Sequence, residues 1–240
     1  STALTTNGLG LEKRAGALAA AGLDRINISL DTIDRERYAA LTRRDRLDHV
    51  LQAIAAADAA GLHPIKINAV VMPGVNEEDI VPLADYAVHH GAQLRFIEQM
   101  PLGPREQWRR EDMVAAEDIL TRLRTHFAMT PAREPRGSAP AALWEVSAPD
   151  GTHGTLGIIA SVTHPFCGDC DRTRLTTDGA IRNCLFGNSE TPLRDLLRSG
   201  ASDAEIMEAW AGEMWTKKPG HGIDDEGFLQ PDRPMSAIGG

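Results

Sequence analysis

The chain has 240 residues, of which 42% are hydrophobic and 25% are charged, and its formal net charge is −9. This composition excludes a disordered or fibrous protein, and the acidic balance argues against an extended nucleic-acid surface, though not against a local phosphate pocket. No apolar run reaches the roughly 18–20 residues that a membrane span requires. We therefore expect a cytoplasmic globular protein with neither a membrane nor a nucleic-acid partner.

The first half of the chain alternates between short apolar runs and amphipathic segments. Thr5 and its neighbours have the pattern of a strand end, and further strands are predicted at residues 25–30, 64–72 and 93–98. The predicted helices are 9–21, one around 50–57 and one around 80–88, and they end at Gly22, Gly61 and Gly91. This alternation predicts a parallel sheet with helical crossovers, in which functional groups collect at the C-terminal ends of the strands.

The second half has a different character. A helix at 113–127 and a linker at 130–141 lead into two predicted hairpins, one formed by 142–147 and 153–160, the other by 173–177 and 180–184. Two helices follow. Thr191 is expected to cap the first of them, and Ser202 with Glu205 to form a capping box for the second. The sequence thus divides into domains at residues 1–130 and 131–240.

All three cysteines are close together, with the spacing Cys167-x2-Cys170-x13-Cys184. Two thiols in a tight turn and a third on a following hairpin form a set of soft ligands that suits Zn²⁺ or an iron–sulfur cluster. Zinc would take a fourth ligand, for which His164 or His153 is available. A 4Fe–4S cluster would keep one iron open to a substrate atom. Unrelated buried cysteines are the third interpretation.

Two arginines follow the second cysteine. In an extended segment Arg172 and Arg174 point the same way, which places two guanidiniums beside the cysteines. Such a pair binds phosphate or carboxylate well because each fork is bidentate and always charged. The alternative is a solvated strand face with surface ion pairs. Alternation over residues 94–100 further predicts that Glu98 faces inward.

Several segments, taken in order, closely resemble the GTP 3′,8-cyclases, the molybdenum cofactor biosynthesis protein A family of radical SAM enzymes. They are Thr5 to Gly8, Ile26 to Asp31, Arg95 to Glu98, Phe166 to Arg174, Cys184 and the terminal Gly239-Gly240. The resemblance implies an α/β fold: the C-terminal portion of an incomplete TIM-type (β/α)6 radical SAM barrel. An α+β C-terminal domain with an iron–sulfur cluster is expected to follow the barrel.

The resemblance also implies an activity, the conversion of GTP to 3′,8-cyclo-7,8-dihydro-GTP in the first step of molybdenum cofactor biosynthesis. Family members cleave S-adenosylmethionine on an N-terminal 4Fe–4S cluster, and the resulting 5′-deoxyadenosyl radical takes the 3′ hydrogen of GTP. The implied partners are GTP, S-adenosylmethionine, an electron donor and the downstream cyclic pyranopterin monophosphate synthase protein. A homodimer is a further expectation.

Residue by residue, the resemblance assigns roles to positions of this chain. Cys167, Cys170 and Cys184 match the ligands of the second 4Fe–4S cluster. The GTP contacts are Thr5, Lys66, Arg95, Arg172, Thr173 and Arg174. Ser29 and Met100 match contacts of S-adenosylmethionine, and Gly239-Gly240 matches a tail that enters the active site. Three of them have an ordinary alternative: a strand-end cap for Thr5, a surface lysine for Lys66 and core packing for Met100.

The sequence departs from the family in one respect. The radical-generating Cys-x3-Cys-x2-Cys motif and the Gly-Gly-Glu-Pro segment that holds S-adenosylmethionine are absent from these residues. We expect both to lie upstream of residue 1, so that this chain is a fragment that is inactive alone. The main alternative is a zinc-stabilised module that binds a nucleotide or a partner without redox chemistry. A radical SAM enzyme acting on a peptide would leave the paired arginines and the Gly-Gly end unexplained.

Overall fold

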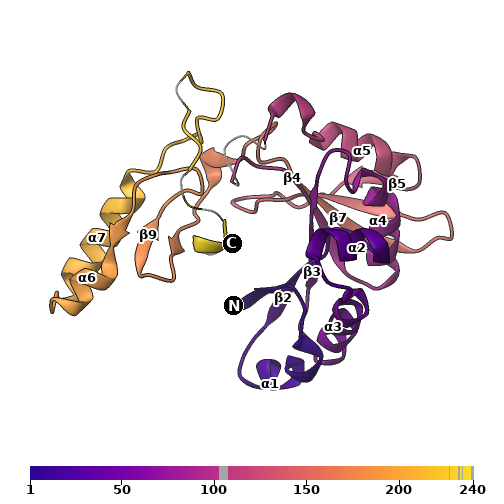
Figure 1. Ribbon diagram of the computed structural model, residues 1–240, viewed down its shortest axis with the longest axis horizontal. Coiled ribbons are helices and arrows are strands. Elements are labelled where there is room, and N and C mark those ends of the chain that lie inside the picture. Colours follow the sequence, from indigo (N-terminus) through magenta and orange to yellow (C-terminus); the bar gives the residue numbers. More distant parts are fainter. Residues whose placement is uncertain (103–107, 227, 232, 234, 239–240) are drawn as a thin grey trace. The chain divides into compact units, whose positions relative to one another are not determined.

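The computed structural model describes residues 1–102, 108–226, 228–231, 233 and 235–238 (Figure 1). The chain divides into two compact units. Unit 1 comprises residues 1–99, 113–136 and 141–163, and unit 2 comprises residues 100–112, 137–140 and 164–240. The units interleave along the chain, and the expected domain division after residue 130 stays a prediction.

Unit 1 is built on a mixed seven-stranded sheet with the order β1-β2-β3-β4-β7-β6-β5. The first five strands in this order run parallel: β1 (Ala3–Thr6), β2 (Arg25–Ser29), β3 (Ile65–Val71), β4 (Gln93–Glu98) and β7 (His153–Ile159). Two antiparallel strands complete the sheet: β6 (Ala142–Ser147) and β5 (Ala128–Pro131). The predicted α/β class and the strands of the first half are confirmed.

The first predicted hairpin forms, and it extends the sheet of the first half. Its second strand, β7, pairs in parallel with β4, so that Leu156 lies opposite Leu94. The prediction of a linker at 130–141 is wrong at its start, because β5 lies there and pairs with β6. Three of its four residues are exposed, so this strand shows no apolar alternation that the sequence could reveal.

Five α-helices belong to unit 1: α1 (Ala15–Ala20), α2 (Arg35–Thr42), α3 (Leu47–Ala59), α4 (Ile80–His89) and α5 (Ala116–Arg124). Short 3-10 turns, η1 (Leu11–Lys13) and η2 (Glu77–Asp79), precede α1 and α4. The single helix predicted at 9–21 is wrong, because Gly10 adopts a left-handed φ of 79° and Arg14 interrupts the helical path. Helix α2 was not predicted, since Tyr38 is its only buried residue.

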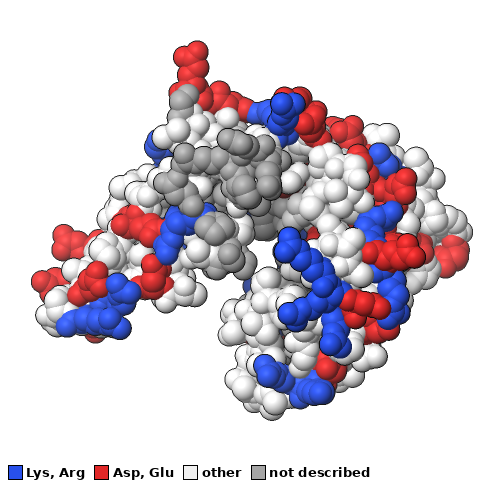
Figure 2. Space-filling model, in the orientation of Figure 1, with Lys and Arg blue, Asp and Glu red and all other residues white. Residues whose placement is uncertain are grey.

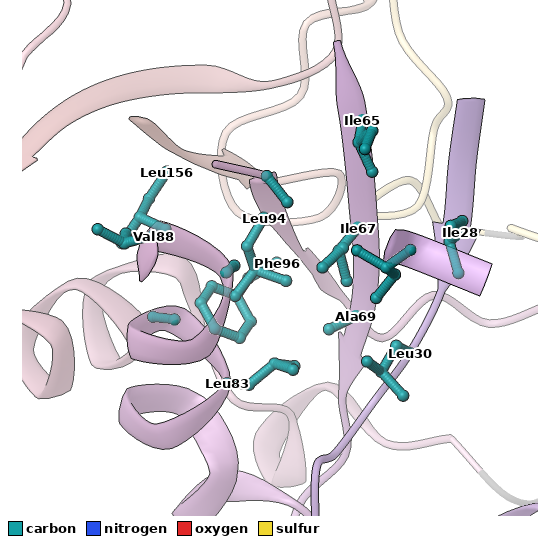
Figure 3. Close-up of a cluster of buried hydrophobic side chains, with 14 of the residues drawn as sticks. Ile28, Leu30, Ile65, Ile67, Ala69, Leu83, Val88, Leu94, Phe96 and Leu156 are labelled. Atoms are coloured by element: carbon teal, nitrogen blue, oxygen red, sulfur yellow. The ribbon is translucent and has the colours of Figure 1, made fainter. Parts of the chain in front are cut away.

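The core of unit 1 includes buried residues of the sheet and of helices α3, α4 and α5. Figure 3 shows part of it, where Leu83 and Val88 of α4 lie near Leu94 and Phe96 of β4. Strand β3 shows why these residues form it. Alternate positions of the strand are at most 1% exposed and face the helices: Ile65, Ile67, Ala69 and Val71. The intervening residues Lys66 and Asn68 are half-buried, and period-two alternation turns them to the opposite face of the sheet.

Unit 2 contains a small antiparallel sheet with the order β10-β9-β8. Its strands are β8 (Arg174–Leu175), β9 (Ala180–Arg182) and β10 (Thr191–Pro192). Helices α6 (Leu193–Arg198) and α7 (Asp203–Trp215) follow, with 3-10 turns η3 (Arg110–Asp112), η4 (Cys167–Asp169) and η5 (Met235–Ala237) elsewhere in the unit. The predicted hairpin is confirmed in a shorter form by β8 and β9.

The two cap predictions in unit 2 had different outcomes. The capping box is confirmed, because the Ser202 hydroxyl accepts from the Glu205 N–H while the Glu205 carboxylate accepts from the Ser202 N–H. The cap at Thr191 is wrong. Thr191 lies in β10, where its hydroxyl donates to Glu213 at 2.7 Å, and the N-cap position of α6 belongs to Pro192.

Acidic and basic side chains are interspersed over the visible face of the molecule, without one extended basic surface (Figure 2). Within the described residues, no helix combines the length and the apolar character needed to cross a membrane.

Candidate functional site

The helix-free face of the unit 1 sheet carries a row of polar side chains. Backbone register places Thr5 opposite Asn27 and Asn27 opposite Lys66. One step further along the strands, Asn68 lies opposite Arg95. Because alternate strand residues share a face, these five side chains project from the same side of β1–β4. The structure therefore brings together three of the predicted GTP contacts: Thr5, Lys66 and Arg95.

A chain of hydrogen bonds joins this row across four strands. The Nε of Arg95 donates to Asn68 Oδ1 at 2.8 Å, and its Nη2 donates to Asn27 Oδ1 at 3.1 Å. The Nδ2 of Asn27 in turn donates to Thr5 Oγ1 at 3.1 Å. Arg95 is thereby held by two neutral amide oxygens, which leave its positive charge uncompensated.

Three cations share this face. Arg25 precedes Asn27 by two residues in β2, and Lys66 and Arg95 lie on the next two strands. Burial, then the charges of Arg95 and Arg25, lower the pKa of Lys66, and burial followed by Arg25 lowers the pKa of Arg95. No ion pair among the described residues includes any of the three. A half-buried face with three unpaired cations favours an anionic ligand.

The two predicted S-adenosylmethionine contacts fall in different units. Ser29 is exposed at the end of β2, opposite Asn68 in register and on the polar face. Met100 is half-buried in unit 2. Since each unit is described by itself, the pairing of Ser29 with Met100 at one site stays a prediction.

Glu98 faces inward, as the alternation predicts, but towards the helix-covered core and not towards the polar row. It shares the helix-covered face with Leu94 and Phe96 and is fully buried. Its Oε1 accepts hydrogen bonds from the Ala116 N–H (2.8 Å) and the Thr163 hydroxyl (2.5 Å). Its Oε2 accepts from the N–H groups of Val162 (2.8 Å) and Thr163 (2.9 Å). Glu98 is therefore a structural anchor between β4, the start of α5 and the segment after β7.

The three cysteines lie around η4 and the end of β9 in unit 2. Cys167 and Cys170 bracket the single turn of η4, and the Cys170 N–H donates to the Cys167 carbonyl at 3.2 Å. All three thiols are free and half-buried. Burial, followed by the nearby Cys184, raises the pKa of Cys167. Burial opposes ionisation of Cys170 as well, but the N–H and guanidinium of Arg172 outweigh it and lower the pKa of Cys170.

In the described part of the chain, no three His, Cys, Asp or Glu side chains are arranged to hold a metal ion. The chemistry of the donors still suits an iron–sulfur cluster, because three thiols lie close enough to affect one another's pKa. His153, one of the two suggested zinc ligands, belongs to unit 1, where its Nδ1 and the Ser147 hydroxyl lie 2.7 Å apart.

Basic groups surround the cysteine segment. Arg172 lies 3.3 Å from Cys170 Sγ through its Nε and stacks over the Phe166 ring at 4.7 Å. Burial, followed by the charge of Arg172, lowers the pKa of Arg174. The Thr173 hydroxyl oxygen is buried, and among the described residues it has no hydrogen-bond partner. A buried hydroxyl beside two guanidiniums is an arrangement in which a ligand could supply the absent hydrogen bond.

Lys217 is a basic residue that the sequence analysis missed. Its Nζ donates to the carbonyls of Arg172 (2.6 Å) and Asn183 (2.7 Å), so it ties the arginine segment to the loop that leads to Cys184. Lys217 follows α7 and is 45 residues from Arg172, so no local spacing could have pointed to it.

The segment before the C-terminus is anchored by ion pairs. Arg233 donates through Nη1 to both carboxylate oxygens of Glu190 at 2.8 Å, and through Nη2 to Asp178 at 2.7 Å. Glu190 also accepts from the buried Arg182 at 2.6 Å. Gly239 and Gly240, the predicted tail residues, lie outside the described residues.

Comparison with known proteins identifies relatives of the chain. Residues 92–223 match the family model "Molybdenum Cofactor Synthesis C", and residues 1–87 match the radical SAM superfamily. The chain is 75% identical over 241 residues to a GTP 3′,8-cyclase of Corynebacterium glutamicum, covering 99% of the chain and 64% of that protein. It is 59% identical over 238 residues to GTP 3′,8-cyclase 2 of Mycobacterium tuberculosis, covering 99% of the chain and 66% of that protein.

The chain thus spans about two thirds of the length of these relatives. The family model extends over more than half of the chain, from β4 to a point beyond α7, and includes the whole cysteine and arginine segment. The radical SAM match covers β1 to β3 and most of α4. This chain therefore belongs to the molybdenum cofactor synthesis C family and carries a radical SAM region at its N-terminal side.

Proposed function

We propose that this chain is the nucleotide-binding part of a radical SAM GTP 3′,8-cyclase, which converts GTP to 3′,8-cyclo-7,8-dihydro-GTP at the start of molybdenum cofactor biosynthesis. The observation that carries the proposal is the cationic face of unit 1, where hydrogen bonds through Asn27 join Thr5 to Arg95 and Lys66 lies opposite Asn27 in register. The names and high identity of the relatives support it.

The residues of this chain bind and orient the substrate. Lys66 and Arg95 attract the triphosphate, and the Thr5 hydroxyl donates a hydrogen bond to one of its oxygens. In unit 2, Arg172, Thr173 and Arg174 contact the nucleotide beside the cysteines. Because the cations are held on half-buried strands, little reorganisation is needed when the anion arrives.

Cys167, Cys170 and Cys184 would hold a 4Fe–4S cluster, and Ser29 and Met100 would contact S-adenosylmethionine. These two groups supply the one-electron and radical chemistry when they are bound. All three cysteines of the chain belong to this one segment, so a second, radical-generating cluster requires ligands that the 240 residues do not contain. We therefore expect no turnover by the chain alone.

The finer fold belongs to the same proposal. Strands β1–β4 of unit 1 are assigned to the C-terminal portion of a (β/α)6 barrel, and residues 131–240 to the C-terminal domain that ends in the Gly239-Gly240 tail. The parallel order of β1–β4, with helix α3 between β2 and β3 and helix α4 between β3 and β4, supports this, because a (β/α) barrel alternates parallel strands with helices. The proposed partners also include an electron donor and the cyclic pyranopterin monophosphate synthase. We further propose that the protein forms a homodimer and lies in the cytoplasm.

Anaerobic reconstitution of the chain with iron and sulfide tests the proposal. We expect about four irons and four sulfides per chain, and their loss in Cys184→Ser. Addition of GTP should change the electron paramagnetic resonance spectrum of the reduced cluster, and ATP should not. One zinc per chain without sulfide would instead favour the zinc-stabilised module and overturn the cyclase assignment. An equal response to ATP would overturn the choice of GTP.

A further inference from the structure

The side chain of Arg95 is enclosed by three residues that have no charge of their own. Asn68 and Asn27 each accept one hydrogen bond from its guanidinium, at 2.8 and 3.1 Å. Gly157 lies opposite it on β7. Arg95 is thus fixed from β2, β3 and β7 at once, and a long side chain fixed in this way loses little further entropy when it binds a ligand.

The chemistry of the two amides is suited to holding a cation for use by a ligand. A carboxylate would fix the guanidinium equally well but would cancel its charge, whereas an amide oxygen accepts the hydrogen bond and leaves the charge. The sheet residues of the described strands β1–β4 on this face include no Asp or Glu. The positive charges of Arg95 and Lys66 therefore remain available.

Asn27 has a second action, because its amide is shared between two side chains. Its oxygen accepts from Arg95, and its Nδ2 donates to the hydroxyl oxygen of Thr5 at 3.1 Å. A hydroxyl has one proton to donate. Since Thr5 already accepts from Asn27, its proton is left to point away from the amide, where a phosphate oxygen could accept it.

Gly157 provides the space that Arg95 occupies. A Cβ atom at this position would lie 3.0 Å from the Cγ of Arg95 and 3.2 Å from the Cβ of Ala141. Gly157 has no left-handed φ, so the backbone conformation does not explain the glycine. Gly154, on the same strand, is its counterpart on the other face, where an added Cβ would lie 3.1 Å from a methyl group of Val88 in the core.

We propose that Asn27, Asn68 and Gly157 are positioning residues, which act through Arg95 and Thr5 to preorganise this face for the triphosphate group of the nucleotide. This inference rests on the proposed function, since it assigns the polyphosphate end of the substrate to unit 1.

Calorimetric titration of the chain with inorganic triphosphate, and separately with GTP, tests the inference. Asn68→Ala should weaken triphosphate binding about tenfold, since it removes one hydrogen bond to a charged group. Asn68→Asp keeps an acceptor for Arg95 but cancels its charge, so it should weaken binding more than Asn68→Ala. A purely structural role predicts the reverse order, and that result would overturn the proposal.

Two further comparisons locate the effect at Arg95. Gly157→Ala should weaken triphosphate binding, whereas the control Gly154→Ala, which crowds the core to a similar degree, should lower the melting temperature but leave the affinity unchanged. In an Arg95→Ala background, Asn68→Ala should have no further effect, because it acts through the guanidinium. Equal losses in both backgrounds would contradict the inference.

The same titrations separate this inference from the proposed function. Tight triphosphate binding that depends on Asn68, together with equal affinity for GTP and ATP, would support the positioning residues and count against the GTP assignment. Selective GTP binding that Asn68→Ala leaves unchanged would do the opposite. A chain that does not bind triphosphate at all would overturn the inference.

Discussion

Replacing Glu98 with Gln should destabilise unit 1 strongly, because four donors hydrogen-bond to its buried carboxylate. The carboxylate is fully buried and accepts from three backbone N–H groups and one hydroxyl, at 2.5–2.9 Å. A glutamine amide can keep its oxygen on the N–H groups of Val162 and Thr163. Its NH2 group then takes the place of Oε1, where the Thr163 hydroxyl can turn to accept from it but the Ala116 N–H loses its acceptor.

The cost follows from this count. One buried N–H loses its partner, and two remaining hydrogen bonds change from charged to neutral acceptors, which together amount to about 2–4 kcal/mol. With a urea dependence of about 3 kcal/mol per molar, the unfolding midpoint should fall by about 1 M. That is a large part of the roughly 5–15 kcal/mol by which a domain is stable.

Urea unfolding followed by far-ultraviolet circular dichroism measures the effect. Glu117, exposed in the first turn of α5, is the matched control, and Glu117→Gln should shift the free energy of unfolding by less than about 0.5 kcal/mol. If Glu98→Gln and Glu117→Gln unfold at the same midpoint, the four-donor anchor does not stabilise the unit and the reasoning fails.

Two further predictions concern pH. Hydrogen bonds from Thr176 and then Arg233 lower the pKa of Asp178 from 3.8 to about 2. The stabilisation that the Asp178 carboxylate gives to the segment of Arg233 should therefore be present above pH 3.8 and be lost as pH falls towards 2. Amide hydrogen exchange of residues 228–231 measures this loss, and Arg233→Ala should reduce its pH dependence, with the part due to the Thr176 hydrogen bond remaining. The Asp150 carboxylate raises the pKa of His89 above 6.5, so that pair stabilises below pH 6.5 and weakens as pH rises through the raised value. Titration of the His89 ring by nuclear magnetic resonance should show the raised pKa and its return towards 6.5 in Asp150→Asn; an unchanged pKa would contradict the pairing.

Local patterns predicted much of the fold, and long-range pairing set the rest. The alternation in β3 is visible in the sequence because both faces of that strand have distinct environments. The place of β7 beside β4 is not visible, since a hairpin pattern fixes only its own two strands. Helix α2 was missed because one buried tyrosine gives no periodicity, although its N-cap, Asp34, accepts from the Arg37 N–H as a local rule would predict.

The residues of the candidate site also fall into two groups, those that local sequence patterns could reveal and those that they could not. The cysteine spacing and the arginines beside it could be found because they lie close together in the chain. Asn27 and Arg95 are 68 residues apart in the chain, and only the register of the strands brings them together. The sequence alone therefore gives no sign that these two residues interact. The alternation of β2 and β3 was the signal that could have found Asn27 and Asn68, because it turns both to the face of Lys66.

Strand β4 shows how one register separates a binding face from a structural anchor. Arg95 and Glu98 are three residues apart, so they project from opposite faces of the sheet. On the core face, four protein donors take up the charge of Glu98. A carboxylate on the polar face would instead pair with Arg95 or Lys66 and compete with an anionic ligand. The burial of Glu98 thus keeps the carboxylate of the strand away from Arg95 and Lys66, which the proposed anion binding requires.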